Sequence, residues 1–169
     1  MRLFLRDFRT VEASINLAEN QTLASWLLNS RSYVNLRGAE WGTNGRVKHA
    51  ALKISQVLWA LPMDHDIPLV ATAPQPHPRP VEIQLEGSLV LRAGLNIGAR
   101  QRLSDYLESQ GQFIAVRSAS LLRSGRPPKQ VNVTLGDIVL NQEAVQAIWE
   151  IAGDTVLDET EPAESAARR

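Results

Sequence analysis

The chain has 169 residues, with 18 Lys and Arg balanced by 18 Asp and Glu, no Cys, and 44% apolar residues. That length suits one ordinary domain or two very small ones, and a formal charge of zero argues against a protein that binds nucleic acid by neutralising phosphates. The lack of Cys excludes disulfides, thiolate metal sites and a cysteine nucleophile, and no apolar run approaches the ~18 residues of a membrane-spanning helix. We therefore expect a soluble or membrane-extrinsic cytoplasmic protein.

The first 61 residues predict short strands and one short helix. Residues 1–9 mix apolar side chains with Arg2, Arg6 and Arg9, which is typical of a first strand or of a segment that lies on a lipid surface or in a groove of a partner. Residues 23–28 carry apolar side chains at helical spacing. Further strands are predicted over 11–17, 33–36, 47–54 and 57–61.

Proline marks the middle of the chain. Six of the nine prolines lie in residues 62–80, where fixed φ angles and missing N–H groups predict an extended connector. The second half predicts a helix over 102–107. Its strands are expected over 81–86, 89–91, 113–116, 131–135 and 145–151. Residues 153–169 are polar and aperiodic and predict a flexible tail.

The two halves match each other without a gap over part of their length. Residues 23–30 match 103–110, and residues 33–39 match 113–119, both at an offset of 80 positions. The positions that keep identity or character are Leu23/Leu103, Trp26/Tyr106, Leu27/Leu107, Tyr33/Phe113, Val34/Ile114, Leu36/Val116, Arg37/Arg117 and Ala39/Ala119. Chance agreement of short apolar patterns is the alternative explanation.

Flanking matches extend the repeat. Val11–Glu12 matches Val81–Glu82 at an offset of 70, and Val57–Trp59 matches Ala147–Trp149 at an offset of 90. We predict an α+β, β-rich fold formed by tandem duplication, in which two small β-modules of about four strands and one short helix pack on each other because neither buries enough surface alone. The predicted boundaries are 1–61 for the first module, 62–80 for the connector, 81–152 for the second module and 153–169 for the tail.

Three segments of the second half carry a likeness to known proteins: the RLSDYL string at 102–107, Phe113–Ala119 and Val139–Trp149. They resemble a family of small bacterial β-domains of uncharacterised function, in which an RLSDYL-type turn precedes an apolar strand. The resemblance covers most of residues 81–151 and the first half only loosely, where Leu23-Ala-Ser-Trp replaces Leu-Ser-Asp-Tyr. It implies a β-fold and no particular reaction. The chain is also similar in general type to membrane-extrinsic accessory subunits of bacterial photosynthetic reaction centre–antenna complexes. No sequence motif supports this second resemblance.

No residue pattern predicts a catalytic, metal or cofactor site. His65 lies between two Asp in the connector and His77 follows twelve positions later, a spacing that matches no common metal-ligand pattern. Ser104 or Asp105 is expected to cap the short helix and not to serve as a nucleophile. The glycine-bearing loops lack phosphate-binding sequences. We therefore expect no enzyme, no bound metal and no cofactor.

The large aromatic side chains divide into core and surface candidates. The repeat-matched pairs are expected in the core: Trp26/Tyr106, Tyr33/Phe113 and Trp59/Trp149. Trp41 has no aromatic counterpart in the second half and is a candidate surface anchor, because Trp and Arg dominate the energetics of many interfaces.

These features favour a non-catalytic adaptor or scaffold that docks on a larger assembly. The expected partners are protein subunits of a complex and the surface of a membrane, with the protein peripheral on the cytoplasmic face of the inner membrane. The predicted partner-binding residues are Arg2, Phe4, Arg6, Arg9, Arg37, Trp41 and Arg117, and further Arg residues (Arg46, Arg100, Arg102, Arg123, Arg126) extend the set. The alternative is a small β-barrel module that binds nucleic acid or another ligand through Arg and aromatic side chains.

Overall fold

The computed structural model describes residues 1–41, 45–63, 68–69, 78–124 and 129–151. Most of the predicted proline connector and all of the predicted tail therefore lie outside the described residues. The strands are β1 (Arg2–Leu5), β2 (Thr10–Ser14), β3 (Tyr33–Trp41), β4 (Arg46–Lys53), β5 (Val57–Leu61), β6 (Arg79–Leu85), β7 (Leu89–Leu95), β8 (Phe113–Ser124), β9 (Lys129–Asn141) and β10 (Val145–Glu150). The α-helices are α1 (Leu23–Asn29) and α2 (Leu103–Ser109), and the 3-10 turns are η2 (Ile54–Gln56), η3 (Glu86–Ser88) and η4 (Gln142–Ala144).

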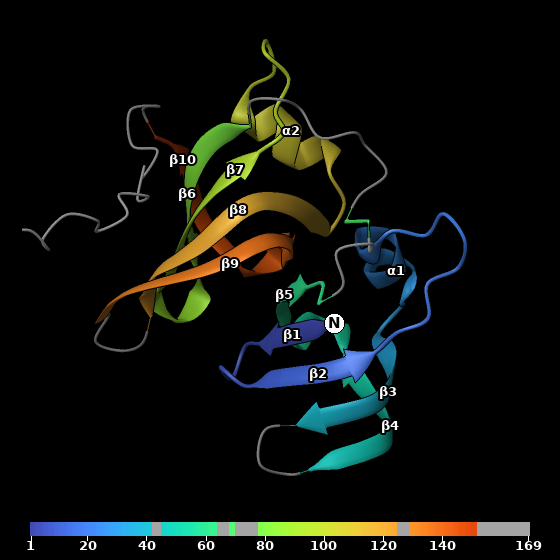
Figure 1. Ribbon diagram of the computed structural model, residues 1–169. Helices are drawn as coiled ribbons and strands as arrows, with labels where there is room; N and C mark the ends of the chain where they lie inside the picture. The colour runs from blue at the N-terminus through green and yellow to red at the C-terminus, as the bar shows by residue number, and fades with distance from the viewer. Residues whose placement is uncertain (42–44, 64–67, 70–77, 125–128, 152–169) are drawn as a thin grey trace, which may run out of the picture.

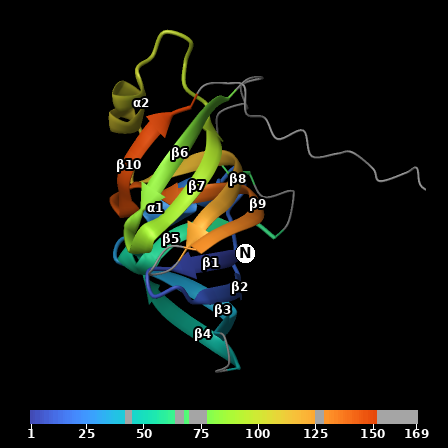
Figure 2. The same cartoon turned by 90° about the vertical axis from the view of Figure 1, so that its left-hand side faces the viewer.

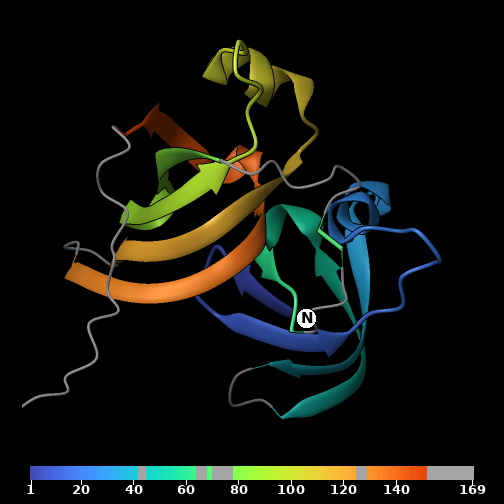
Figure 3. The same cartoon turned by 45° about the horizontal axis from the view of Figure 1, so that its top comes forward.

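The predicted β-rich class is confirmed, and in the described residues each half contributes five strands where about four were predicted. The fifth strand of the first half is β1, since residues 2–5 join the sheet. All strand pairs are antiparallel and form one ten-stranded sheet with the order β10-β6-β7-β8-β9-β5-β1-β2-β3-β4 (Figures 1 and 2). Each half has the same internal order, with its last strand beside its first. The sheet curves strongly at the long strands β8 and β9, drawn in orange shades in Figure 3.

One seam joins the two halves within this sheet. Strand β5 lies between β1 and β9, with Trp59 opposite Leu140 and Ala60 opposite Val139. The side-chain amide of Asn141 donates a buried 2.9 Å hydrogen bond to the carbonyl oxygen of Val57 across the same seam. The halves are therefore connected by backbone pairing and by a buried polar contact.

The two helices begin differently. Before α1, the Thr22 hydroxyl accepts a hydrogen bond from the Ser25 amide (3.1 Å) while the Ser25 hydroxyl accepts one from the Thr22 amide (3.0 Å), which satisfies two donors that a helix start leaves open. The residue before α2 is Arg102, which makes no capping bond. The predicted cap from Ser104 or Asp105 is wrong because both residues lie inside the first turn of α2.

Equivalent positions of the two halves differ by 80 in number over the first three strands. Leu3 faces Val11 across β1 and β2 as Ile83 faces Leu91 across β6 and β7. Positive φ angles recur at the same interval, at Phe8 and Ser88 and again at Gly38 and Ser118. These φ values are uncommon in residues other than glycine, so their recurrence is independent of the apolar pattern.

The registers correct both flanking matches of the predicted repeat. Val11 is equivalent to Leu91 and not to Val81, because Val81 lies in the strand equivalent to β1. At the end of each half the interval is 88: Leu5 faces Val57 as Leu85 faces Val145. Trp59 is therefore equivalent to Ala147 and not to Trp149.

Two apolar cores lie on the sheet, and each takes side chains from the other half. The first contains Phe113, Ala115 and Val139 from β8 and β9 among residues of the first half. The second contains Leu58 and Trp59 from β5 among residues of the second half. Because each core is completed by the opposite half, we expect the two halves to unfold together.

The prediction that the repeat-matched aromatics are core residues is correct for three of the six. Trp59, Tyr106 and Phe113 are buried, Trp26 is half-buried, and Tyr33 and Trp149 are 57% and 40% exposed. Tyr33 alternates with buried Val34, so it occupies the outer face of β3. Phe113 has the equivalent position, but the first core covers it.

Gly87 occupies a turn that no other residue type fits well. Its φ is +70°, and an added Cβ would stand 2.5 Å from Cζ of Phe8. We expect Gly87→Ala to lower the free energy of unfolding by about 1–3 kcal/mol, measured by chemical denaturation. Gly136→Ala is the control, because Gly136 also has a positive φ but has open space around its Cα. Equal losses in the two variants would show that the Phe8 contact contributes nothing.

Candidate functional site

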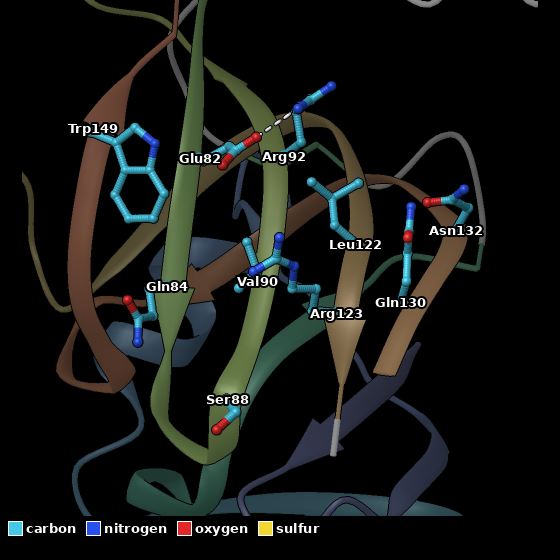
Figure 4. A pocket seen from close by; sticks show the side chains of 10 residues that line it. All are labelled: Glu82, Gln84, Ser88, Val90, Arg92, Leu122, Arg123, Gln130, Asn132 and Trp149. Atoms are coloured by element: carbon cyan, nitrogen blue, oxygen red, sulfur yellow. Dashed lines mark hydrogen bonds and ion pairs between the residues drawn. The ribbon is translucent and has the colours of Figure 1, made fainter. Parts of the chain in front are cut away.

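A groove of about 520 Å³ lies across the strands of the second half (Figure 4). We call it the β6–β10 groove, because all five strands of that half contribute to it. Its lining residues are Glu82, Gln84, Ser88, Val90, Arg92, Leu122, Arg123, Gln130, Asn132 and Trp149. In Figure 4, Trp149 stands at one side and Gln130 and Asn132 at the other, with Val90 and Arg123 between them.

The floor of the groove carries one ion pair. Glu82 and Arg92 face each other across β6 and β7, and their side chains approach to 2.6 Å. The equivalent pair of the first half has the opposite polarity, with Arg2 bound to Glu12 at 2.6 Å. Both pairs are partly exposed, so each contributes little to stability and mainly orients its side chains.

Arg123 and Trp149 are the groove residues best suited to bind a ligand. Arg123 is exposed and makes no hydrogen bond or ion pair with any described residue, which leaves its planar guanidinium available for a carboxylate or phosphate. Trp149 presents 40% of its surface. Amide side chains of Gln84, Gln130 and Asn132, all on exposed residues, add donors and acceptors. A rigid sheet thus presents an aromatic face, a cation and amides together.

The predicted partner-binding residues of the N-terminus lie elsewhere and have partners within the chain. Arg6 binds Glu86 at 2.6 Å, and Phe4 stacks on Trp59 with ring centroids 4.2 Å apart. Arg9 binds Asp7 and lies 5.9 Å from the ring centre of Trp41. These N-terminal side chains therefore already have partners within the chain, and an external partner would have to displace these contacts.

The remaining predicted residues are separated along the sheet. Arg117 binds Asp137 at 2.5 Å, whereas Arg37 is exposed and faces His49 at the position equivalent to Asp137. Trp41 is half-buried against the first core and under Arg9, which weakens its assignment as a free anchor. The structure does not gather these residues into one patch with the β6–β10 groove.

Three described groups have a shifted pKa: the carboxyl of Asp7, the guanidinium of Arg9 and the phenol of Tyr106. The guanidinium of Arg9 donates hydrogen bonds to Asp7 and lowers the pKa of that carboxyl below its usual value, while the carboxylate raises the pKa of Arg9. Burial raises the pKa of the Tyr106 phenol on α2. None of these groups lines the groove, so the shifts describe structural contacts and not a reactive site.

The remaining candidate residues from the sequence form no metal-binding cluster among the described residues. His65, His77 and Arg126 lie outside the described residues. Among the residues that are described, no three His, Asp or Glu side chains come close enough together to hold a metal ion. No described helix is long and apolar enough to cross a membrane.

The groove residues were only partly visible in the sequence. The repeat predicts Trp149 in the core, and the sequence includes Arg123 only within the wider Arg set. The signal that could have located them is the period-two recurrence of polar side chains at Glu82 and Gln84 and at Gln130 and Asn132. That pattern indicates two polar strand faces, but it does not show that they belong to one surface.

Comparison of the chain with protein-family models, curated proteins and solved structures found no match. The function of this chain therefore has to be inferred from its own geometry.

Proposed function

We propose that this protein is a non-catalytic scaffold subunit that binds a partner protein in the β6–β10 groove. The observation that carries the proposal is that exposed Trp149 on β10 and Arg123 on β8 line one groove, with β6 and β7 between them, and that Arg123 makes no ion pair with any described residue. Buried Trp and Arg side chains dominate the energy of many interfaces, and here both are presented before binding. The partner segment that suits this groove carries a carboxylate for Arg123 and an apolar side chain or planar group for Trp149.

The specific version of the proposal is a membrane-extrinsic subunit on the cytoplasmic face of a membrane complex. Its support is the Arg- and aromatic-rich N-terminus, the proline-rich connector and the resemblance in type to accessory subunits of photosynthetic reaction centre–antenna complexes. None of these specifies a partner, so the partner is better identified by the groove chemistry.

We also infer that the two halves arose by tandem duplication. Support comes from the shared strand order, the constant interval of 80 through β1–β3 and β6–β8, and the matched positive φ angles. The charge reversal of Arg2–Glu12 against Glu82–Arg92 is the kind of paired change that keeps an ion pair while two copies diverge. The groove chemistry would then be a specialisation of the second copy.

The proposal is tested by capture and then by mutation. Tagged protein is purified from its native cells in gentle detergent, and the co-purifying proteins are identified. We expect Trp149→Ala to weaken binding of the main partner by about 30-fold, the effect of losing ~2 kcal/mol at an interface hot spot, and Arg123→Ala to weaken it about tenfold, measured by calorimetry. Arg31→Ala, just before β3, is the control, since Arg31 is exposed and does not line the groove.

A monomeric protein that co-purifies with nothing, or a partner whose affinity is unchanged by both groove variants, would overturn the proposal. One alternative is favoured by the same residues, because single-stranded nucleic acid also stacks on Trp and contacts Arg on a sheet face. Binding of a labelled oligonucleotide that weakens with salt and is lost in Trp149→Ala would establish that alternative instead.

A further inference from the structure

The two end strands of the sheet pair on one side only. Within the described residues, β4 pairs with β3 and β10 pairs with β6, and neither has a second neighbour. Figure 1 shows β4 and β10 at opposite ends of the molecule, so one chain cannot join them to each other. Unpaired strand edges expose N–H and C=O groups that another strand can bind.

The seam inside the chain shows which strands suit these edges. Val34 faces Leu52 across β3 and β4 as Ile114 faces Leu140 across β8 and β9, so β4 is equivalent to β9. Strand β10 is equivalent to β5 by the registers given above. The seam between β5 and β9 therefore has one counterpart, the pairing of β10 with β4, and only a second copy of the chain can supply it.

We propose that copies of this protein associate head to tail, with β10 of one copy pairing antiparallel with β4 of the next. Transferring the seam register of Ala60 and Val139 places Ile148 opposite Ala51 of the next copy. Transferring Trp59 and Leu140 places Ala147 opposite Leu52 of the next copy. A contact between two different surfaces repeats, so it produces rings or open chains and not a single dimer.

Charge supports this pairing. Strand β4 exposes Arg46, Lys48 and Lys53, while the β10 end exposes Glu143 just before the strand and Glu150 at its last residue. Of these two carboxylates, Glu150 already binds Arg79 of its own chain at 2.8 Å, so Glu143 is the one available to the next copy. The transferred register sets Lys53 opposite Gln146, near Glu143 of the other copy. Glu143 and Lys53 make no ion pair with any described residue of their own chain.

The contact is expected to be weaker than the internal seam. Leu58 and Trp59 are buried at the seam, whereas their equivalents Gln146 and Ala147 are exposed and bury far less apolar surface. Association should therefore be seen at high concentration and low salt, where the opposite charges of the two edges are least screened.

Crosslinking tests the register, because the chain has no Cys of its own. In the double variant Ala51→Cys with Ile148→Cys, opposed thiols can reach disulfide distance only between copies. We expect covalent dimers and higher species on oxidation at high protein concentration. The control is Ala51→Cys with Gln146→Cys, which displaces one thiol by two residues, about 7 Å along the strand, and should crosslink at least fivefold less. Equal crosslinking of both variants, or none in either, would overturn the pairing.

Charge exchange gives a second readout that does not depend on thiols. Sedimentation of the whole protein should show larger species as concentration rises at low salt, and these should be reduced at least threefold in Lys53→Glu. The double variant Lys53→Glu with Glu143→Lys should restore them. Both residues are exposed, so folding should be unaffected. A protein that sediments as a monomer at every concentration and salt would refute self-association while leaving the proposal for the β6–β10 groove intact.

Discussion

Trp59→Ala is expected to lower the free energy of unfolding by about 3–5 kcal/mol, the usual loss for truncating a buried Trp. Trp59 is 3% exposed, stacks on Phe4 at 4.2 Å, and faces Leu140 across the seam. The side chain belongs to the first half by sequence but packs in the second core. Its loss should therefore destabilise both halves at once, and far-ultraviolet circular dichroism during denaturation should show one transition at a lower midpoint.

The matched control is Trp149→Ala, which removes the same side chain from a position that is 40% exposed and should cost only about 1 kcal/mol, the typical loss for a point substitution. Two separate transitions in the Trp59 variant would contradict the shared cores, because they would show that each half folds by itself.

Asn141→Ala should lower the free energy of unfolding by about 2–4 kcal/mol, since the buried Val57 carbonyl and the partly buried Glu143 amide lose their partner. The Asn141 amide donates to the Val57 carbonyl at 2.9 Å, and its oxygen accepts a 3.1 Å hydrogen bond from the Glu143 amide at the start of η4. Asn141 is fully buried, so water does not replace its bond to Val57 in the folded state. Denaturant unfolding measures the loss, and hydrogen exchange at residues 142–144 should accelerate.

Asn35→Ala is the control for Asn141→Ala, because Asn35 is exposed on β3. A loss no greater than that of the control would mean that the seam does not depend on this amide and that backbone pairing of β5 and β9 is sufficient.

Local sequence pattern located most elements of the fold. The helix predicted over 23–28 is α1, since Thr22 and Ser25 form the two capping hydrogen bonds and apolar spacing fits a helix. The strand predicted over 57–61 is β5 to the residue. Strands β8 and β9 are much longer than predicted, because Arg117-Ser118 in β8 and Gly136-Asp137 in β9 interrupt the apolar pattern by which a strand is predicted.

The contacts of the candidate site residues could not be predicted from local sequence pattern. Arg6 and Glu86 are 80 residues apart, and the ion pair between them exists only because two turns of the sheet meet. Likewise, the sequence does not indicate a partner for Arg117, because Asp137 comes beside it only through the pairing of β8 with β9. Neither contact leaves a periodic signal, so the predicted Arg docking set included side chains that the fold already uses.

Residue type and spacing determined the β-rich class, the two short helices and the lack of any thiol chemistry, because these depend on each residue and its near neighbours. The tertiary structure alone decided which strands are adjacent, and with them the seam, the shared cores and the groove. Tyr33 and Phe113 show the reason: they hold equivalent positions, yet one is exposed and the other buried. The alternation of residues along a strand indicates which of its faces packs on its own core. Whether the other face is also buried depends on segments far away in the chain.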